Sequence, residues 1–167
     1  KTCALQAGSP ALNTGAGSTI TSDQRGFRII DVPDLGAYET QLGGTFAFGA
    51  TGFFANEAGP ATITIKRLGG NEGTAIVRVT TQNGTASAED FTARPDTGAS
   101  DILFNDGQDT ATILIQLASD SVVEPNELFS VKLSSPSPGT TLGAISTATV
   151  VIVDPSSTSG DTKNPNL

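Results

Sequence analysis

The stretch ILFNDGQDTATILIQL, residues 102–117, contains two apolar runs on either side of a turn sequence. Asn105-Asp106-Gly107 reverses a chain readily, because Gly tolerates backbone angles that other residues avoid and Asn and Asp bond to their own backbone. After the turn, Ile113, Ile115 and Leu117 recur at every second position, which is the period of a half-buried strand. The stretch therefore predicts two β-strands joined by a reversal.

The same two-residue period recurs on both sides of this stretch. It predicts seven strands, around Phe46 and Phe48 and in TITIKRL (62–68), AIVRVTT (75–81), ILF (102–104), TATILIQL (110–117), LFSVKL (128–133) and TATVVIV (147–153). Gly, Asn, Asp and Pro cluster between these runs, at positions where a chain turns. We therefore predict an all-β fold, a seven-stranded antiparallel Greek-key or immunoglobulin-like sandwich with an irregular N-terminal extension.

The composition fits one domain with additional segments. The chain has 167 residues, of which 37% are hydrophobic and 16% charged, and this is enough for one core of modest size. Regular alternation begins only after Gly43-Gly44, so we predict an N-terminal extension (1–43), the sandwich (44–155) and a polar tail or linker (156–167). Because the chain begins with Lys1 rather than Met, we expect a processed product or a piece of a longer protein.

The charge of the chain restricts its partners. A net charge of -8 argues against nucleic acid or an anionic membrane surface, because either needs a cationic face on the protein. No run is long and apolar enough to span a bilayer. Cys3 is the single cysteine and there is no histidine, so the usual ligands of zinc are missing. Cations that prefer oxygen ligands are the more natural partners.

Acidic residues follow alternate strands of the predicted sandwich. Successive antiparallel strands run in opposite directions, so the loops after the first, third, fifth and seventh strands lie at the same end. These loops contain Glu57, Asp90, Asp120, Glu124 and Asp154. Taken singly, each acid also fits a solvated strand end or a turn cap. Taken together, they predict a cluster of carboxylates at one pole, contributed by segments far apart in the chain.

Such a cluster favours calcium. Neighbouring carboxylates raise each other's pKa unless a cation lies among them. Ca2+ accepts about six to eight oxygen ligands from flexible loops, whereas Mg2+ retains more of its water. We therefore predict that the five acids bind Ca2+. Glu127 is left out of the set, because at the start of a strand we expect it to hold loop amides. Arg94 is expected to pair with Asp96 or to neutralise part of the cluster when no ion is bound.

From about Thr45 to Pro155 the chain resembles a Calx-beta domain. The resemblance rests on FFANEAG (53–59), NGTASAEDF (83–91), ILFNDGQDTATILIQL (102–117), DSVVEPNELFSVKLSSP (120–136) and ATVVIVD (148–154). It implies a calcium-binding sandwich whose ligands include Glu57, Asp90, Asp120, Glu124 and Asp154. Many members have consecutive acids where this chain has Ser119-Asp120 and Asp154-Pro155, so the resemblance implies one or two ions that are bound weakly.

The segment before the sandwich resembles the closing part of a parallel β-helix of bacterial surface proteins. SPALNTGAG, SDQRGF and DLGAYE carry this resemblance, which covers about residues 4–40. A single terminal rung cannot bury its apolar face alone, because repeat architectures depend on stacked neighbours. We therefore expect this segment to contact the sandwich, a neighbouring domain or another copy of the chain.

Three functions are compatible with these features. The first is a calcium-binding structural or adhesive module, extracellular or on a bacterial cell surface, in which Ca2+ stiffens the loops at one pole. The second is a self-assembling extracellular filament subunit that uses the N-terminal segment for subunit contacts. The third is an accessory fragment of a polysaccharide-active enzyme. We expect no catalysis by this chain, because it has no His, no Trp and no nucleophile motif.

Overall fold

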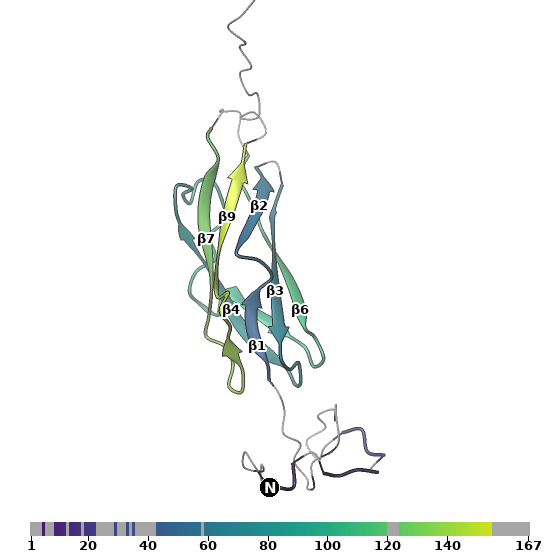
Figure 1. Cartoon of the computed structure of the whole chain (residues 1–167). Helices are drawn as coiled ribbons and strands as arrows, with labels where there is room; N and C mark the ends of the chain where they lie inside the picture. The colour runs from purple at the N-terminus through teal and green to yellow at the C-terminus, as the bar shows by residue number, and fades with distance from the viewer. Residues whose placement is uncertain are drawn as a thin grey trace, which may run out of the picture.

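The computed structural model describes residues 43–57, 59–119 and 124–154, together with positions 5, 9–12, 14–17, 19–22, 29, 33 and 35. Within these residues it shows a β-sandwich with a short 3-10 turn at Gly98–Ser100 (Figure 1). Its nine strands are β1 (Thr45–Phe48), β2 (Gly52–Asn56), β3 (Ala61–Leu68), β4 (Ala75–Asn83), β5 (Asp101–Phe104), β6 (Thr110–Ile115), β7 (Glu127–Ser134), β8 (Thr141–Leu142) and β9 (Thr147–Val153). All seven predicted strands are present, and β2 and the two-residue β8 are additional.

The strands form two sheets, with the orders β6-β3-β1-β8 and β2-β9-β7-β4-β5. The predicted all-β sandwich is confirmed, but two of its pairings, β1 with β8 and β2 with β9, are parallel. The reason is that the chain changes sheet between β1 and β2, which run in the same direction (Figure 1). Gly49 donates its N–H to Thr64 O in the first sheet, and Thr51 O accepts the N–H of Thr149 in the second. The predicted first strand is thus β1, and β2 continues the chain in the other sheet.

The core lies between the sheets and consists of the inward-facing positions that the alternation predicted. It includes Phe46, Phe48, Ile63, Ile65, Val77, Val79, Phe104, Ile115, Phe129, Val131, Leu133 and Val150. Phe91 and Phe129 are both buried and stack with their ring centroids 4.0 Å apart. Burial of one such ring contributes about 1.5–3 kcal/mol. This pair therefore anchors the segments that begin at Asp90 and Glu127.

Arg67 fixes the point at which the chain enters the sandwich. Its side chain is almost completely buried in the first sheet, with 2% of its surface exposed. It donates hydrogen bonds to the carbonyl oxygens of Gly43, Asn71, Glu72 and Gly73. Burial is the main cause that lowers the pKa of its guanidinium, while nearby carboxylates act in the opposite direction. Arg67 thus joins residue 43 to the turn between β3 and β4.

Little of the N-terminal segment belongs to the described residues. Three backbone hydrogen bonds connect Leu35 to Ala11, Gly15 to Pro33 and Ile29 to Thr21, in a nested order. The resemblance to a β-helix end falls largely outside the described residues and stays a prediction. The predicted tail, residues 156–167, also lies outside them. Where the structure is described, no helix has the length and hydropathy to cross a membrane.

Candidate metal centre

Three acids continue the inward-facing rows of three neighbouring strands. Side chains alternate between the two faces of a strand, so residues two positions apart face the same side. In β9, buried Val150 and Ile152 are followed two positions later by Asp154. In β2, Phe53 and Ala55 face the core and Glu57 follows at the same spacing. In β7, buried Phe129 is preceded by Glu127. The core-facing rows of these strands therefore end in carboxylates at the same pole.

The register of the strands brings these three positions together. β2 and β9 pair in parallel up to Asn56 and Val153, and Glu57 N–H still donates to Val153 O at 3.1 Å. Glu127 is the register partner of Ile152 on the other side of β9. Glu57 and Asp154 therefore leave their strands side by side, and Glu127 lies across from the end of β9.

Asp90 and Glu124 reach the same pole from loops. Asp90 lies between β4 and β5, where its Oδ2 accepts the N–H of Ser87 at 2.6 Å. Its carbonyl accepts the N–H of Ala118, which ties this loop to the end of β6. Glu124 precedes β7, and its N–H donates to Asp154 Oδ2 at 2.7 Å. Asp154 is itself buried, with 5% of its surface exposed. The two loops are therefore held by backbone hydrogen bonds to carboxylates.

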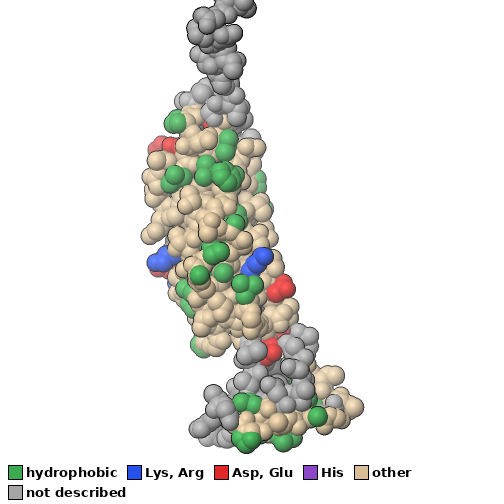
Figure 2. All heavy atoms as spheres, in the orientation of Figure 1, with side chains coloured by type: hydrophobic (Ala, Val, Ile, Leu, Met, Phe, Trp, Pro, Cys, Tyr) green, Lys and Arg blue, Asp and Glu red, His purple; other side chains and the backbone are tan. Residues whose placement is uncertain are grey.

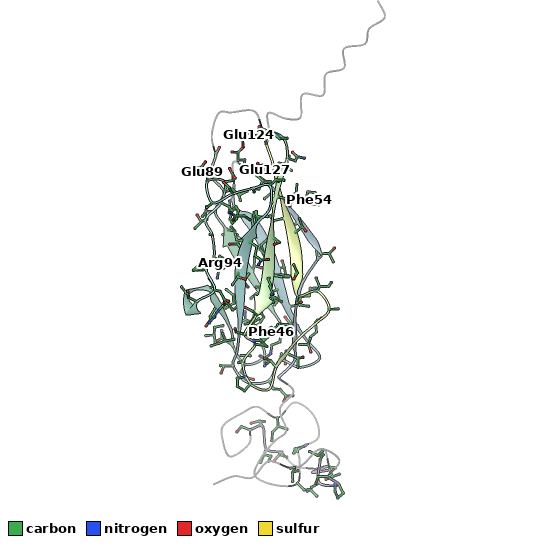
Figure 3. The ribbon with its side chains drawn as sticks, turned by 90° about the vertical axis from the view of Figure 1, so that its left-hand side faces the viewer. Phe46, Phe54, Glu89, Arg94, Glu124 and Glu127 are labelled. Atoms are coloured by element: carbon green, nitrogen blue, oxygen red, sulfur yellow. The ribbon has the colours of Figure 1, made fainter. Side chains whose placement is uncertain are left out.

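These residues line one pocket, which we name the acidic pocket. Its lining consists of Glu57, Asp90, Glu124, Pro125, Glu127, Ile152 and Asp154. Figure 3 shows Glu124 and Glu127 at the same end of the sandwich, with Glu89 close by and Phe46 toward the opposite end. Of the five acids singled out from the sequence, Glu57, Asp90, Glu124 and Asp154 thus meet in space. Asp120 lies outside the described residues, so its membership of the cluster stays a prediction.

Glu127 is the residue that the sequence reasoning left out. Carboxylate oxygens of Asp90, Glu124 and Glu127 all lie within 4.8 Å of one another, so Glu127 belongs to the most compact part of the cluster. The signal that could have found it is the alternation of β7, because a residue two positions before the inward-facing Phe129 must face inward too.

The charges in the pocket disturb one another. The pKa of Glu127 is raised, first because its carboxyl is partly removed from water, and then by the negative charges of Asp90 and Glu124. A hydrogen bond with Asp90 and the charge of Glu57 act in the same direction. Like charges at this separation favour the protonated form of one partner. Without a cation, the pocket therefore holds more negative charge than its geometry favours.

The donor set fits a hard divalent cation. All five acids that line the acidic pocket offer carboxylate oxygens, and its described lining contains no nitrogen or sulfur ligand. Two ligands on opposite sides of Ca2+ are separated by about 4.6–5.2 Å, because each lies about 2.3–2.6 Å from the ion. The Asp90, Glu124 and Glu127 oxygens lie no farther apart than this, so a single ion can contact all three. The residues present therefore fit Ca2+.

The fold and the pocket define a class of protein, a β-sandwich module with carboxylates from several loops gathered at one pole. The family model of the Calx-beta domain matches residues 41–156, and the chain belongs to this family. The resemblance drawn from the sequence motifs of the sandwich is thereby confirmed. Calx-beta domains are non-catalytic modules, so the chain is not an enzyme.

Relatives and solved structures agree with this assignment. The chain is 40% identical over 91 residues to adhesion G-protein coupled receptor V1 of Danio rerio, and 33% identical over 102 residues to extracellular matrix organizing protein FRAS1 of Homo sapiens. These matches cover 54% and 60% of this chain but only 1% and 2% of those proteins. The apo form of the Calx CBD1 domain matches with a TM-score of 0.60 and 32% identity, over 66% of this chain and 96% of that one. The calcium binding domain CBD12 of CALX1.1 matches equally well in TM-score and identity, over 65% of this chain and 45% of that one.

Proposed function

We propose that this chain is an extracellular structural or adhesive module whose loops are held together at one pole by Ca2+. The proposed ligands are the predicted set and one residue added from the geometry: Glu57, Asp90, Asp120, Glu124, Asp154 and Glu127. The ion supplies positive charge and oxygen coordination among loops that would otherwise repel. The sandwich supplies the fixed strand ends from which these loops start.

A single observation carries this proposal. Five acids line one small pocket, and they come from the residue after β2, the β4–β5 connection, the segment before β7, the start of β7 and the residue after β9. Acids that merely ended strands at the surface would point into water. Asp154 is instead buried, and the pKa of Glu127 is raised because its carboxyl is partly removed from water. A cation offsets both costs.

Weak binding by one or two ions follows from the lost acids. The resemblance to the family implies further carboxylates at the positions of Ser119 and Pro155, and this chain has none there. Extracellular calcium modules commonly have dissociation constants of about 0.1–1 mM. Such an affinity is sufficient outside a cell, where calcium is abundant. The relatives named for adhesion and for the extracellular matrix support this location, and a bacterial surface remains our expectation from the N-terminal segment.

Thermal unfolding with and without calcium tests the proposal. Binding to the folded state alone stabilises it by about 2.7 kcal/mol at a hundred times the dissociation constant. For a domain of this size that corresponds to a rise in Tm on the order of 10 °C. We expect calcium to raise Tm, a chelator to reverse the rise, and Mg2+ at equal concentration to do less. An unchanged Tm across millimolar calcium would reject the calcium site.

A matched pair of variants separates this site from general charge effects. Glu124→Gln removes a carboxylate that lines the acidic pocket, whereas Glu89→Gln removes an exposed one that does not. Both lie near the same pole (Figure 3). We expect the first variant to lose most of the calcium-induced rise in Tm and the second to keep it. Equal responses would mean that calcium only screens the net charge.

A second candidate function is self-association through the N-terminal segment. The observation that favours it is Leu35, whose side chain is 57% exposed although its N–H is bonded to Ala11 O. Single exposed apolar side chains are common on protein surfaces, so Leu35 marks the point where a contact with another copy can be tested. Light scattering after size exclusion, with Leu35→Asp as the comparison, tests this function. A monomer at every concentration would exclude it.

A further inference from the structure

Arg94 lies in the connection between β4 and β5 and has no carboxylate partner among the described residues. Its side chain is half-buried, and its Nε and Nη2 donate to the carbonyl oxygens of Val79 and Ser100, each at 3.2 Å. The expected pairing with Asp96 is wrong, because Asp96 lies 3.1 Å from Arg78 Nη1 instead. Burial alone lowers the pKa of Arg94. A fixed, partly desolvated cation of this kind is stabilised by an incoming anion.

A groove opens beside this cation, and we name it the Arg94 groove. Residues 93–96 form one wall, and the outward-facing side chains of β4 and β7 form its floor. Its lining includes Thr80, Gln82, Asn83, Arg94, Lys132 and Ser134, and also Asp96, whose carboxylate is paired with Arg78. Lys132 is exposed and takes part in neither salt bridge of the described residues. Ser134 Oγ is buried without a hydrogen-bond partner in the described part of the chain. The groove thus combines Arg94 and Lys132, which form no ion pair with another described residue, with the side-chain amides of Gln82 and Asn83.

Positive charge is concentrated around this groove. Residues 43–154 contain five Lys and Arg residues, of which Arg94 and Lys132 line the groove and Arg78 is the register partner of Ser134 on its floor. On the face shown in Figure 2, the few cationic side chains lie at mid-height of the sandwich, away from the pole where Figure 3 places Glu124 and Glu127. Because Arg78 is paired with Asp96 and Asp101, the positive charge that an anion would meet in the groove is that of Arg94 and Lys132.

The hydrogen-bonding groups of the groove distinguish between classes of anion. An extended peptide would need free backbone groups along the edge of β4. At Thr81 these groups are occupied, because Thr81 N–H donates to Arg94 O and Arg94 N–H donates to Thr81 Oγ1. The apolar side chains of the lining are small, being those of Ala93 and Pro95, so no deep pocket exists for a peptide side chain. The exposed side-chain amides of Gln82 and Asn83 remain, and these suit the hydroxyl groups of a sugar.

We propose that the Arg94 groove binds an anionic sugar, with the carboxylate or sulfate of the sugar at Arg94 and Lys132 and its hydroxyls at Gln82 and Asn83. Arg94 is pre-positioned by its two carbonyl acceptors, so little side-chain entropy is lost when the anion binds. Lys132 contributes a mobile charge. The site lies apart from the acidic pocket and shares no lining residue with it.

Titration followed by amide chemical shifts tests the proposal. The probes are a hyaluronan tetrasaccharide, which carries carboxylates, a heparin tetrasaccharide, which also carries sulfates, and the uncharged tetramer of N-acetylglucosamine. A chelator is present throughout, so the result does not depend on the calcium site. We expect either charged sugar, at millimolar concentration, to shift the amides of Gln82, Asn83 and Lys132, and the neutral sugar to shift none. The two charged probes show whether carboxylate or sulfate is preferred.

Variants make the test specific to the groove. Lys132→Ala removes an exposed charge of the groove and should weaken binding about threefold, the value of an exposed ion pair. Lys66→Ala removes an equally exposed lysine from the outer face of the other sheet and should leave the affinity unchanged. Arg94→Lys keeps the charge but loses the planar fork, with an expected loss of about tenfold. The Tm of Arg94→Lys shows whether this variant is folded. If it is not, the test rests on Lys132→Ala.

Three results would overturn the proposal. The first is the absence of shifts in the groove with both charged sugars. The second is an equal loss of affinity in Lys66→Ala and Lys132→Ala, which would show attraction by net charge without a site. The third is that a hexaglutamate peptide shifts the same amides as strongly as the charged sugars, which would assign the groove to an acidic peptide.

Discussion

The carboxylate of Asp154 accepts a hydrogen bond from the backbone N–H of Glu124 at 2.7 Å, although the two residues are 30 positions apart. This contact joins the end of β9 to the segment before β7. It means that Asp154 has two separable properties, a hydrogen-bond acceptor that holds a loop and a negative charge that is available to a cation. Substitution can remove one property without the other.

Asp154→Asn and Asp154→Ala should therefore differ. Asn keeps an oxygen that accepts the Glu124 N–H, so the metal-free domain should stay as stable as the wild type while the calcium-induced rise in Tm shrinks. Ala leaves the N–H unpaired, which costs about 1–3 kcal/mol without any metal. Thermal unfolding in chelator and in calcium distinguishes the two effects. Identical stabilities of both variants in chelator would show that the hydrogen bond does not stabilise the metal-free domain.

Glu127→Gln should stabilise the metal-free domain and weaken calcium binding at least about tenfold, because even an outer partner of a metal site commonly has that effect. The pKa of Glu127 is higher in the folded state than in the unfolded state, so ionisation of Glu127 destabilises the folded domain. This destabilisation is absent at pH values below the usual carboxyl pKa and appears as the pH rises through the raised pKa. The variant should therefore gain stability at neutral pH and none near the acid end. Glu89→Gln is the control. A Glu127→Gln domain that binds calcium normally by calorimetry would remove Glu127 from the ligand set.

Arg67→Met should destabilise the sandwich by about 2–4 kcal/mol, because four carbonyl oxygens lose their donor at a buried position. Arg78→Met is the matched comparison. Arg78 bonds to Asp96 and Asp101 on the outer face of the other sheet, where an ion pair contributes less than about 1 kcal/mol. Urea unfolding gives both free energies. Similar values for the two variants would contradict a special role of Arg67 where the chain enters the sandwich.

Gly84→Ala should destabilise the domain by about 1–3 kcal/mol, because an added Cβ would lie too close to the backbone of β7. At Gly84 that atom would come within 2.4 Å of Leu128 O and 2.6 Å of the Leu128 side chain. Gly59→Ala places its Cβ in open space and should cost little. Denaturant midpoints of the two variants test the difference. At Asn83-Gly84 the chain thus turns and also comes close to the backbone of β7 at Leu128.

The alternation of apolar residues was sufficient to predict the strands, because the period of a strand is a local property of the backbone. The seven predicted runs are strands with small shifts at their ends. It was insufficient for β2, since FFAN has two adjacent Phe residues and no clear period, and for β8, which has two residues. These two elements depend on neighbours, as β2 pairs with β9 and β8 with β1.

The sequence by itself determined that this chain is a β-sandwich and that acids from distant loops share one pole, because alternating strand directions follow from antiparallel reversals. The tertiary structure alone decided which acids meet. Glu127 joined the cluster because it faces inward on β7, and Asp154 was drawn inward with a backbone N–H as its partner. It also decided that Arg94 binds backbone carbonyls while Asp96 pairs with Arg78. Side-chain partners depend on which strand edges come together, and that is fixed only when the two sheets pack.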